Sequence, residues 1–452
     1  MGNTLASDGE FEGSKECLAD ALPKELIEKI LSYLSHRELL MVARCSKIYR
    51  DITNQDIFWL SFCMRRRWLK YGLSYDLLNE QSPPYTPPVS ASGKSPIYSF
   101  QEPEHSTLPP LCKWRKVFMR ANHLQNNWKT GRYSIPPPLK GHTENVTCID
   151  SNGQVIVSGS ADKTLRIWDI HTCRCIHKIG SHSDAVTAVK IKGNVIVTGC
   201  ADCSIRVFDS TTGKLTLTFQ GHAGSVDHLA VDGDTIVSAS ADRRIRVWSL
   251  KLGKLTHSFR GHDDDIECLA LHGTHALTGS WDSTLMLFNV VHGEQVWTLR
   301  GHTEVVNCCQ FDDKKIISGS GDGTLKIWHT VLGVELNTLV GHTGEVYCLV
   351  YNHDIIASGS SDSSVILWTH TGKQLAVLNE HIGVVRCLYI DDYKLVSGGD
   401  RKKIVVWDWK ERKVFNAIHR HPTLLHTMCV LETKIITASP AKPGTVTVMS
   451  YW

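Results

Sequence analysis

The chain has 452 residues, a formal net charge of +3, 21% charged residues and 42% hydrophobic residues. These values are ordinary for a globular protein, and a charge so near neutral argues neither for nor against a nucleic-acid partner. No apolar run approaches the roughly 18–20 residues that a membrane-spanning helix needs. The polar, acidic N-terminus predicts no signal peptide.

Residues 1–19 have the composition of a disordered tail. The N-myristoylation pattern requires Ser or Thr at the sixth position, whereas this chain has Ala6 there and Ser7 one place later. An unmodified tail is therefore favoured, and acylation of Gly2 with a membrane anchor is the minor alternative.

Residues 20–72 show the apolar spacing of short helices. Leu26, Ile30 and Leu34 recur every four residues, which places them on one face of a helix that follows Leu22-Pro23. A module of this length lies near the lower limit for independent folding. It either buries its apolar stripe internally or completes its core against a partner.

The order of these residues resembles an F-box, with Tyr49 standing where many members carry Trp. The resemblance implies docking on the Skp-type adaptor of a cullin-RING ubiquitin ligase. A helical cap packed only on the rest of the chain is the alternative. The resemblance assigns ten residues to adaptor binding: Leu22, Pro23, Leu26, Ile30, Leu31, Leu34, Leu39, Leu40, Phe58 and Trp59.

Residues 73–112 form a Pro-rich linker that cannot bury a core and should be flexible. Helical spacing then returns over residues 113–131, where Trp114, Val117 and Phe118 mark an apolar face. The basic residues of this helix are best explained as a solvated face, because no aromatic groove accompanies them for nucleic acid.

A repeat of about 40 residues organises residues 132–452. Asp follows the repeat histidine after 20 residues in the first six units, and Trp or Phe follows after 26 residues in the first seven. The repeat histidines are His142, His182, His222, His262, His302, His342, His381 and His421. Each unit holds short β-branched runs between turn residues, which predicts one four-stranded propeller blade per unit.

The Gly-His, Asp and Trp spacings resemble the WD-repeat family. Trp114-Arg115 and Asn127-Trp128-Lys129 resemble the segment that joins F-box and propeller in phosphodegron-reading F-box/WD-repeat receptors. The resemblance implies a stalk between a small all-α F-box domain and an all-β WD-repeat propeller.

The pattern predicts eight blades, with seven as the alternative. The last unit has only three apparent strands before Trp452, and Tyr133–Ile135 is a strand without a sheet. We therefore expect the N-terminal strand to complete the C-terminal blade, which removes open sheet edges.

The repeat histidines could be metal ligands, but constant spacing to Ser or Thr, Asp and Trp favours buried hydrogen-bonded chains. Phe208 and Phe288 lack the indole donor, and Arg401 occupies the Asp position of the seventh unit, with Asp400 one place earlier. We expect these blades and the eighth to be the weakest. Several cysteines follow a repeat histidine by six residues, which predicts reduced, buried thiols rather than disulfides or zinc ligands.

In WD-repeat proteins one end of the central channel binds partners. Phosphodegron readers place several arginines there, because guanidinium groups grip phosphate. This chain is mainly acidic and aromatic at those positions, so a basic or aromatic degron fits better, although a small phosphate site in the seventh blade stays open. The predicted substrate-binding residues are Asp227, Asp265, Glu267, Trp281, Glu345, Tyr347, Arg386 and Arg401.

The sequence therefore predicts the non-catalytic substrate-recognition subunit of an SCF-type ubiquitin ligase, without cofactor or metal, in the cytoplasm or nucleus. Such a subunit would bring a protein substrate to an active site on another subunit. A scaffold that assembles a complex without ubiquitination is the alternative. A hydrolase at the channel mouth is a third hypothesis, for which Asp265 with Glu267 is the one crude candidate pair.

Overall fold

A computed structural model describes residues 22–72, 111–180, 182–401, 403–418, 425, 427–439 and 441–452. The predicted tail, the predicted linker before residue 111, and His421 lie outside these residues. The described chain forms two compact units, residues 22–72 with 111–125 and the residues from 126 onward. None of the described helices combines the length and the apolar character that crossing a membrane requires.

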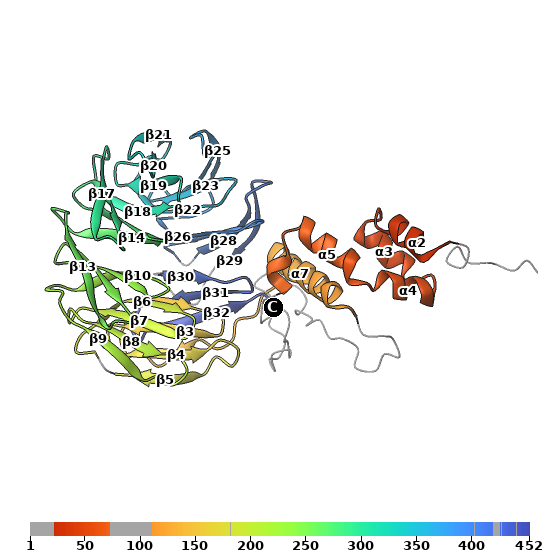
Figure 1. The fold of residues 1–452 in the computed structure, drawn as a ribbon, viewed down its shortest axis with the longest axis horizontal. Helices are drawn as coiled ribbons and strands as arrows, with labels where there is room; N and C mark the ends of the chain where they lie inside the picture. Colours follow the sequence, from red (N-terminus) through yellow and green to blue (C-terminus); the bar gives the residue numbers. More distant parts are fainter. Residues whose placement is uncertain are drawn as a thin grey trace, which may run out of the picture. The chain divides into compact units, whose positions relative to one another are not determined.

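The first unit is helical (Figure 1). Its elements, followed by the helix that enters the second unit, are α2 (Lys24–Leu31), α3 (His36–Val42), α4 (Lys47–Thr53), α5 (Asp56–Arg65), η1 (Leu69–Gly72) and α7 (Lys113–Thr130). A reciprocal capping box begins α3: Glu38 N–H donates to Ser35 Oγ at 3.4 Å, and Ser35 N–H donates to Glu38 Oε2 at 2.7 Å.

Aromatic rings build the core of the first unit. Phe118 of α7 lies with its ring centroid 5.3 Å from Trp59 and 5.2 Å from Trp68, and all three side chains are buried. Trp59 also donates its indole N–H to the Thr53 carbonyl at 2.7 Å. The module thus completes its core with residues from α7, more than 50 positions along the chain from Trp59.

The second unit consists of eight four-stranded antiparallel sheets, so the eight-blade prediction is confirmed and the seven-blade alternative is wrong (Figure 1). The first strands contact one another from blade to blade and close a ring. In the first seven blades they are β2 (Val146–Ser151), β6 (Val186–Lys192), β10 (Val226–Asp232), β14 (Ile266–His272), β18 (Val306–Phe311), β22 (Val346–Tyr351) and β26 (Val385–Ile390). The second strands are β3 (Val155–Ser160), β7 (Val195–Cys200), β11 (Thr235–Ser240), β15 (His275–Ser280), β19 (Lys315–Ser320), β23 (Ile356–Ser360) and β27 (Leu395–Gly399).

The third strand of each blade is largely buried, whereas the outermost strand is the most exposed. The third strands are β4 (Leu165–Asp169), β8 (Ile205–Asp209), β12 (Arg244–Ser249), β16 (Thr284–Asn289), β20 (Thr324–His329), β24 (Val365–Trp368) and β28 (Lys403–Asp408). The outermost strands are β5 (Cys175–Ile179), β9 (Leu215–Phe219), β13 (Lys254–Arg260), β17 (Glu294–Arg300), β21 (Glu335–Val340), β25 (Gln374–Leu378) and β29 (Lys413–Ile418).

The eighth blade joins both ends of the propeller. Its strands are β30 (Thr427–Val430), β31 (Lys434–Ala438), β32 (Thr445–Ser450) and, from the N-terminal side, β1 (Leu139–Lys140). The predicted closure is confirmed, but the strand predicted over Tyr133–Ile135 is wrong in position. Only Ser134 bridges to Ser450 there, because three prolines, which lack N–H donors, separate that bridge from the paired segment.

The last turn of α7 packs within the second unit. Trp128 stacks on Tyr451 with ring centroids 3.5 Å apart, and Asn127 donates its side-chain N–H to the Tyr451 carbonyl at 2.8 Å. The buried Lys394 ammonium lies 4.4 Å from the Trp128 ring centroid. These contacts fasten the chain before β1 to the blade that it completes.

The apolar core lies between neighbouring blades. Leu165 and Ile167 of the first blade pack with Val189 and Phe208 of the second. Cys148 shows why a small residue is needed on the inner strand. Its sulfur packs so closely on Gly159 that a Cβ there would lie only 2.6 Å away. Burial raises the pKa of the Cys148 thiol to about 12, so this side chain behaves as a small hydrophobe.

Candidate functional site

The repeat histidines form hydrogen-bonded chains inside the blades. In the first blade His142 Nδ1 lies 2.9 Å from Asp162 Oδ2 and Nε2 lies 2.8 Å from Ser158 Oγ. The Trp168 indole N–H donates to the same Ser158 oxygen at 2.9 Å. The complete chain recurs from His222, His302 and His342. Both ring nitrogens are engaged, so these histidines support the fold and have no nitrogen left for a metal.

The electrostatics of the first-blade chain fit a neutral histidine and an ionised aspartate. Burial lowers the pKa of His142 and outweighs the opposing effect of Asp162. Burial raises the pKa of Asp162, but hydrogen bonds from Thr164 and His142 outweigh it and bring that pKa to about 2. The carboxylate therefore stays charged and fixes the tautomer with the proton on Nδ1.

Two of the described repeat histidines depart from this pattern at Nδ1. His381 Nδ1 in the seventh blade is buried without a hydrogen-bond partner, as expected from Arg401 at the Asp position. In the second blade His182 Nδ1 is also unpartnered and lies 3.7 Å from Asp202, which was not predicted. Arg206 Nη1 lies 3.3 Å from the same carboxylate. The fourth blade, by contrast, keeps its Asp and Thr contacts despite Phe288.

His182, Cys200 and Asp202 place three potential metal ligands within 4.8 Å of one another, a geometry found at no other group among the described residues. The surroundings oppose a cation, because Arg206 lies beside Asp202 and His182 Nε2 already contacts Thr198 Oγ1 at 2.8 Å. Cys200 replaces the serine that accepts the Asp N–H in neighbouring blades. The trio is therefore a variant of the blade turn.

On the propeller face the fourth blade gathers three predicted substrate-binding residues. Trp281 is 58% exposed, the Trp281 indole N–H donates to Glu267 Oε2 at 2.9 Å, and the Trp281 backbone N–H donates to the Asp265 carbonyl. In the third blade the exposed Asp227 accepts a hydrogen bond from Ser225 Oγ at 2.6 Å. An oriented aromatic ring thus lies beside carboxylates that are accessible to a partner.

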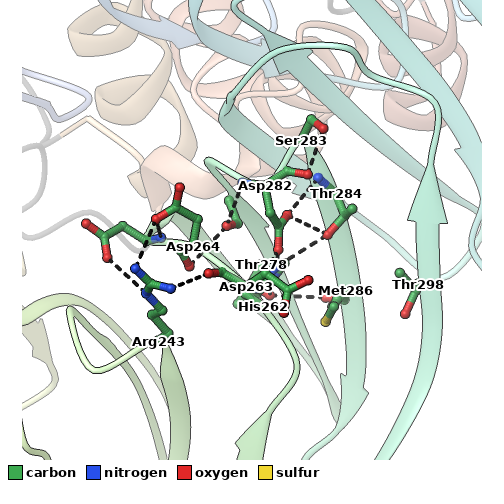
Figure 2. Close-up of polar contacts among 12 residues, drawn as sticks. Arg243, His262, Asp263, Asp264, Thr278, Asp282, Ser283, Thr284, Met286 and Thr298 are labelled. Carbon is green, nitrogen blue, oxygen red and sulfur yellow. Dashed lines mark hydrogen bonds and ion pairs between the residues drawn. The ribbon is translucent and has the colours of Figure 1, made fainter.

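Arg243 is a face residue that the sequence reasoning missed. It extends from the third blade toward the loop before β14, where its guanidinium lies 3.5 Å from Asp264 and 3.9 Å from Asp265 and donates to the Asp263 carbonyl (Figure 2). Asp265 is therefore not an isolated carboxylate. Its position in the repeat could have identified it, because Arg243 directly follows the repeat aspartate, as Lys163 does in the first blade. Lys163 also reaches the next blade from this position, where Arg243 has a positive φ of 61°.

The sixth and seventh blades contribute a second aromatic and charged group. Arg386 donates from Nε to Asp400 Oδ1 at 2.8 Å and places its guanidinium 5.4 Å from the Tyr347 ring centroid. Burial and the neighbouring Glu345 raise the pKa of Tyr347. Arg401 is exposed, and no ion pair joins it to another described residue. Because Asp400 already neutralises Arg386, this group is poorly suited to gripping a phosphate.

The ten residues predicted to bind an adaptor divide into core and surface. Leu31, Leu39, Phe58 and Trp59 are buried in the first unit, so they cannot touch a partner without rearrangement. Leu26 and Ile30 are about half exposed, at 49% and 50%, on one face of α2. Of the other predicted residues, Pro23 is exposed, whereas three are partly exposed: Leu22, Leu34 and Leu40.

Other exposed apolar side chains in the first unit were not predicted: Tyr33, Met41, Ile48, Ile57 and Met64. Helical spacing could have identified part of this set, but a small module exposes apolar residues from several helices at once. Together with Leu26 and Ile30 they leave exposed apolar side chains on several helices of the first unit.

Comparison with known families agrees with this geometry. The family model for the WD domain, G-beta repeat, matches residues 136–169, 173–209, 213–249, 253–289, 293–329, 333–369 and 372–408, more than half of the chain. The chain belongs to the WD-repeat family. The F-box-like family model matches residues 19–65. The three C-terminal strands of the eighth blade, β30 to β32, lie outside the seven matched repeats, whereas β1 lies within the first.

The curated relatives match only part of the chain. A probable E3 ubiquitin ligase complex SCF subunit sconB of Arthroderma otae is 31% identical over 34% of this chain and 22% of its own length. F-box/WD repeat-containing protein 7 of Drosophila melanogaster is 29% identical over 35% of this chain and 10% of its own length. The chain thus spans less than a quarter of either relative.

A solved structure supports the fold. The crystal structure of the computationally designed Ika8 protein superposes with a TM-score of 0.65 and 28% identity, covering 69% of this chain and 98% of the designed chain.

Proposed function

We propose that this protein is the substrate-recognition subunit of an SCF-type ubiquitin ligase. In this proposal the F-box-like unit binds a Skp-type adaptor, and through it a cullin-RING ligase, while the propeller face binds the protein substrate. The pairing of the two modules carries the proposal, together with relatives that are named as SCF subunits. Free, buried cysteines support a reducing compartment, the cytoplasm or nucleus.

The adaptor surface is proposed to be the exposed apolar face of the first unit. Leu26 and Ile30 lie one helical turn apart on α2, and Tyr33 follows with 81% of its surface exposed. Burying such side chains in an interface contributes about 25 cal/mol per Å² of apolar area. The buried Leu31, Leu39, Phe58 and Trp59 hold this surface in place.

The substrate segment is proposed to be basic and to carry an apolar or aromatic side chain. A lysine or arginine over the face of Trp281 would gain a cation–π contact while Glu267 pairs with its charge. Asp227 extends the negative surface into the neighbouring third blade, and Glu345 adds an exposed carboxylate in the sixth blade. A phosphorylated segment is disfavoured, because Arg386 is paired with Asp400 and Arg243 with Asp264.

The protein's contribution to the reaction is proximity. Holding a substrate lysine near a ubiquitin-loaded enzyme raises its effective concentration there. The hydrolase hypothesis loses support, because Asp265 faces Arg243 and Glu267 accepts the Trp281 indole, which leaves no nucleophile–base pair in this candidate site.

Adaptor capture by the purified full chain tests the first half of the proposal. Leu26→Asp combined with Ile30→Asp should weaken capture of a Skp-type adaptor by at least about tenfold, because two apolar contacts become charged. Leu252→Asp is the matched control, since Leu252 is 63% exposed in the propeller unit and should leave capture unchanged. Equal capture by both variants would overturn the proposed adaptor surface.

Proximity labelling in cells, with and without proteasome inhibition, tests the second half. Substrates should be labelled more strongly when the proteasome is inhibited, and Trp281→Ala should abolish that gain. Val331→Ala is the control, since Val331 is an exposed residue between β20 and β21. Partners whose labelling and abundance ignore proteasome inhibition would instead support a scaffold without ubiquitination.

A further inference from the structure

A cavity of about 470 Å³ lies within the first unit, between α3, α4 and the start of α7. Three arginines line it: Arg44, Arg50 and Arg115. Asn54 adds an amide, and Leu40 with Leu111 supplies apolar wall. Residues more than 60 positions apart in the chain thus bring three guanidinium groups to one cavity.

The positive charge in this cavity is not neutralised by described residues. Arg44, Arg50 and Arg115 form no ion pair with any carboxylate in the described part of the chain. Burial lowers the pKa of Arg115, and the charge of Arg50 lowers it further. Bringing like charges together in a partly buried cavity is unfavourable unless an anion joins them.

Arg115 is held in position with one donor to spare. Its Nη1 donates to Asn54 Oδ1 at 3.3 Å, and its guanidinium lies 5.3 Å from the Trp59 ring centroid. Its Nε is buried and has no hydrogen-bond partner. A buried donor without an acceptor is unfavourable, so the arrangement favours a ligand that supplies an oxygen.

We propose that this cavity binds a phosphate group. Guanidinium groups present planar pairs of donors that match the oxygens of a tetrahedral oxyanion, and three of them balance its multiple negative charge. The cavity is larger than a single phosphate, so the group can be free or carried on a small molecule or a phosphorylated side chain. Bound phosphate joins α4 to α7 and thereby stabilises the first unit.

Thermal unfolding of the full chain tests the site. Pyrophosphate at constant ionic strength should raise the melting temperature of the first unit relative to chloride. Arg50→Gln and, separately, Arg44→Gln should abolish this increase. Arg65→Gln is the matched control, because Arg65 is exposed on α5 outside the cavity and should keep the full increase. Replacing pyrophosphate by inorganic phosphate or by a phosphoserine peptide separates the sources of the phosphate group.

The variants also separate an anion site from an ordinary structural arginine. In chloride alone Arg50→Gln should leave the melting temperature unchanged or raise it, since it removes repulsion between Arg50 and Arg115. A fall in chloride together with an unaltered pyrophosphate response would show a structural role and overturn the proposal. So would the absence of any pyrophosphate effect on the natural sequence.

Discussion

The sixth and seventh blades are neighbours that use the same kind of carboxylate differently. In the sixth blade Asp362 lies 2.9 Å from His342 Nδ1 and completes the chain through Ser358 to Trp368. The carboxylate is nearly buried and acts entirely within the fold.

In the seventh blade the aspartate stands one residue earlier. Asp400 points to the face and pairs with Arg386, while His381 keeps its contact with Ser397 at 2.7 Å but has no partner at Nδ1. Gly399 replaces the serine or cysteine of the preceding blades, since a Cβ there would lie 2.7 Å from His381 Nδ1. A shift of one residue thus moves a carboxylate from the blade interior to the propeller face.

The largest difference in the free energy of unfolding is expected between Asp362→Ala and Asp400→Ala. Asp362→Ala should lower the free energy of unfolding by about 1–3 kcal/mol, because it leaves buried His342 unpaired. Denaturant unfolding of the purified chain measures this loss. An equally large loss in Asp400→Ala would contradict the assignment of Asp400 to the face.

The pH dependence of stability should come next in size. Burial lowers the folded-state pKa of His381 to about 4, whereas the unfolded side chain titrates near 6.5. The unfolded state therefore binds more protons between these values, so stability is full above pH 6.5 and falls as the pH drops toward 4. His381→Gln should flatten this part of the unfolding free-energy profile.

The same titration can be followed directly. The His381 ring signal in an NMR titration should shift with a midpoint near pH 4. A midpoint near 6.5 would show that the unpartnered Nδ1 is reached by solvent or by a counter-charge.

The Trp–Ser hydrogen bonds of the sixth and seventh blades should contribute equally to stability. Trp368→Phe and Trp407→Phe each remove an indole N–H that donates to a buried serine, at 2.9 Å and 2.7 Å. Each should lower the free energy of unfolding by about 1 kcal/mol. A much smaller loss for Trp407→Phe would mean that the missing aspartate also weakens the hydrogen bond between Trp407 and Ser397.

The smallest expected effect is that of Asp400→Asn. The Arg386–Asp400 pair is exposed on both sides, so its loss should change the free energy of unfolding by less than about 1 kcal/mol. The informative measurement is binding: the freed Arg386 should increase capture of a phosphopeptide relative to the natural sequence. Unchanged capture would show that Arg386 does not face bound peptides.

The repeat spacing predicted the blades, the closure by the N-terminal strand and the polar chains, because each depends on contacts that recur within one unit. Phe208 and Phe288 were correctly identified as lacking a donor, since the donor is a property of the residue type. The disturbed His182 was not predicted, because Asp202 stands at its expected position in the sequence and only the structure places its carboxylate 3.7 Å from His182 Nδ1.

Tertiary structure alone decided which charges are available to a partner. Arg243 reaches from one blade to the acidic loop of the next, and Asp400 pairs with Arg386 across two strands. In the first unit the tertiary structure buries Trp59 and leaves Ile30 on the surface. It also places Arg115 and Arg50 at the same cavity. A period in the sequence specifies contacts within a repeat, but the charge and exposure of a surface depend on side chains from different elements.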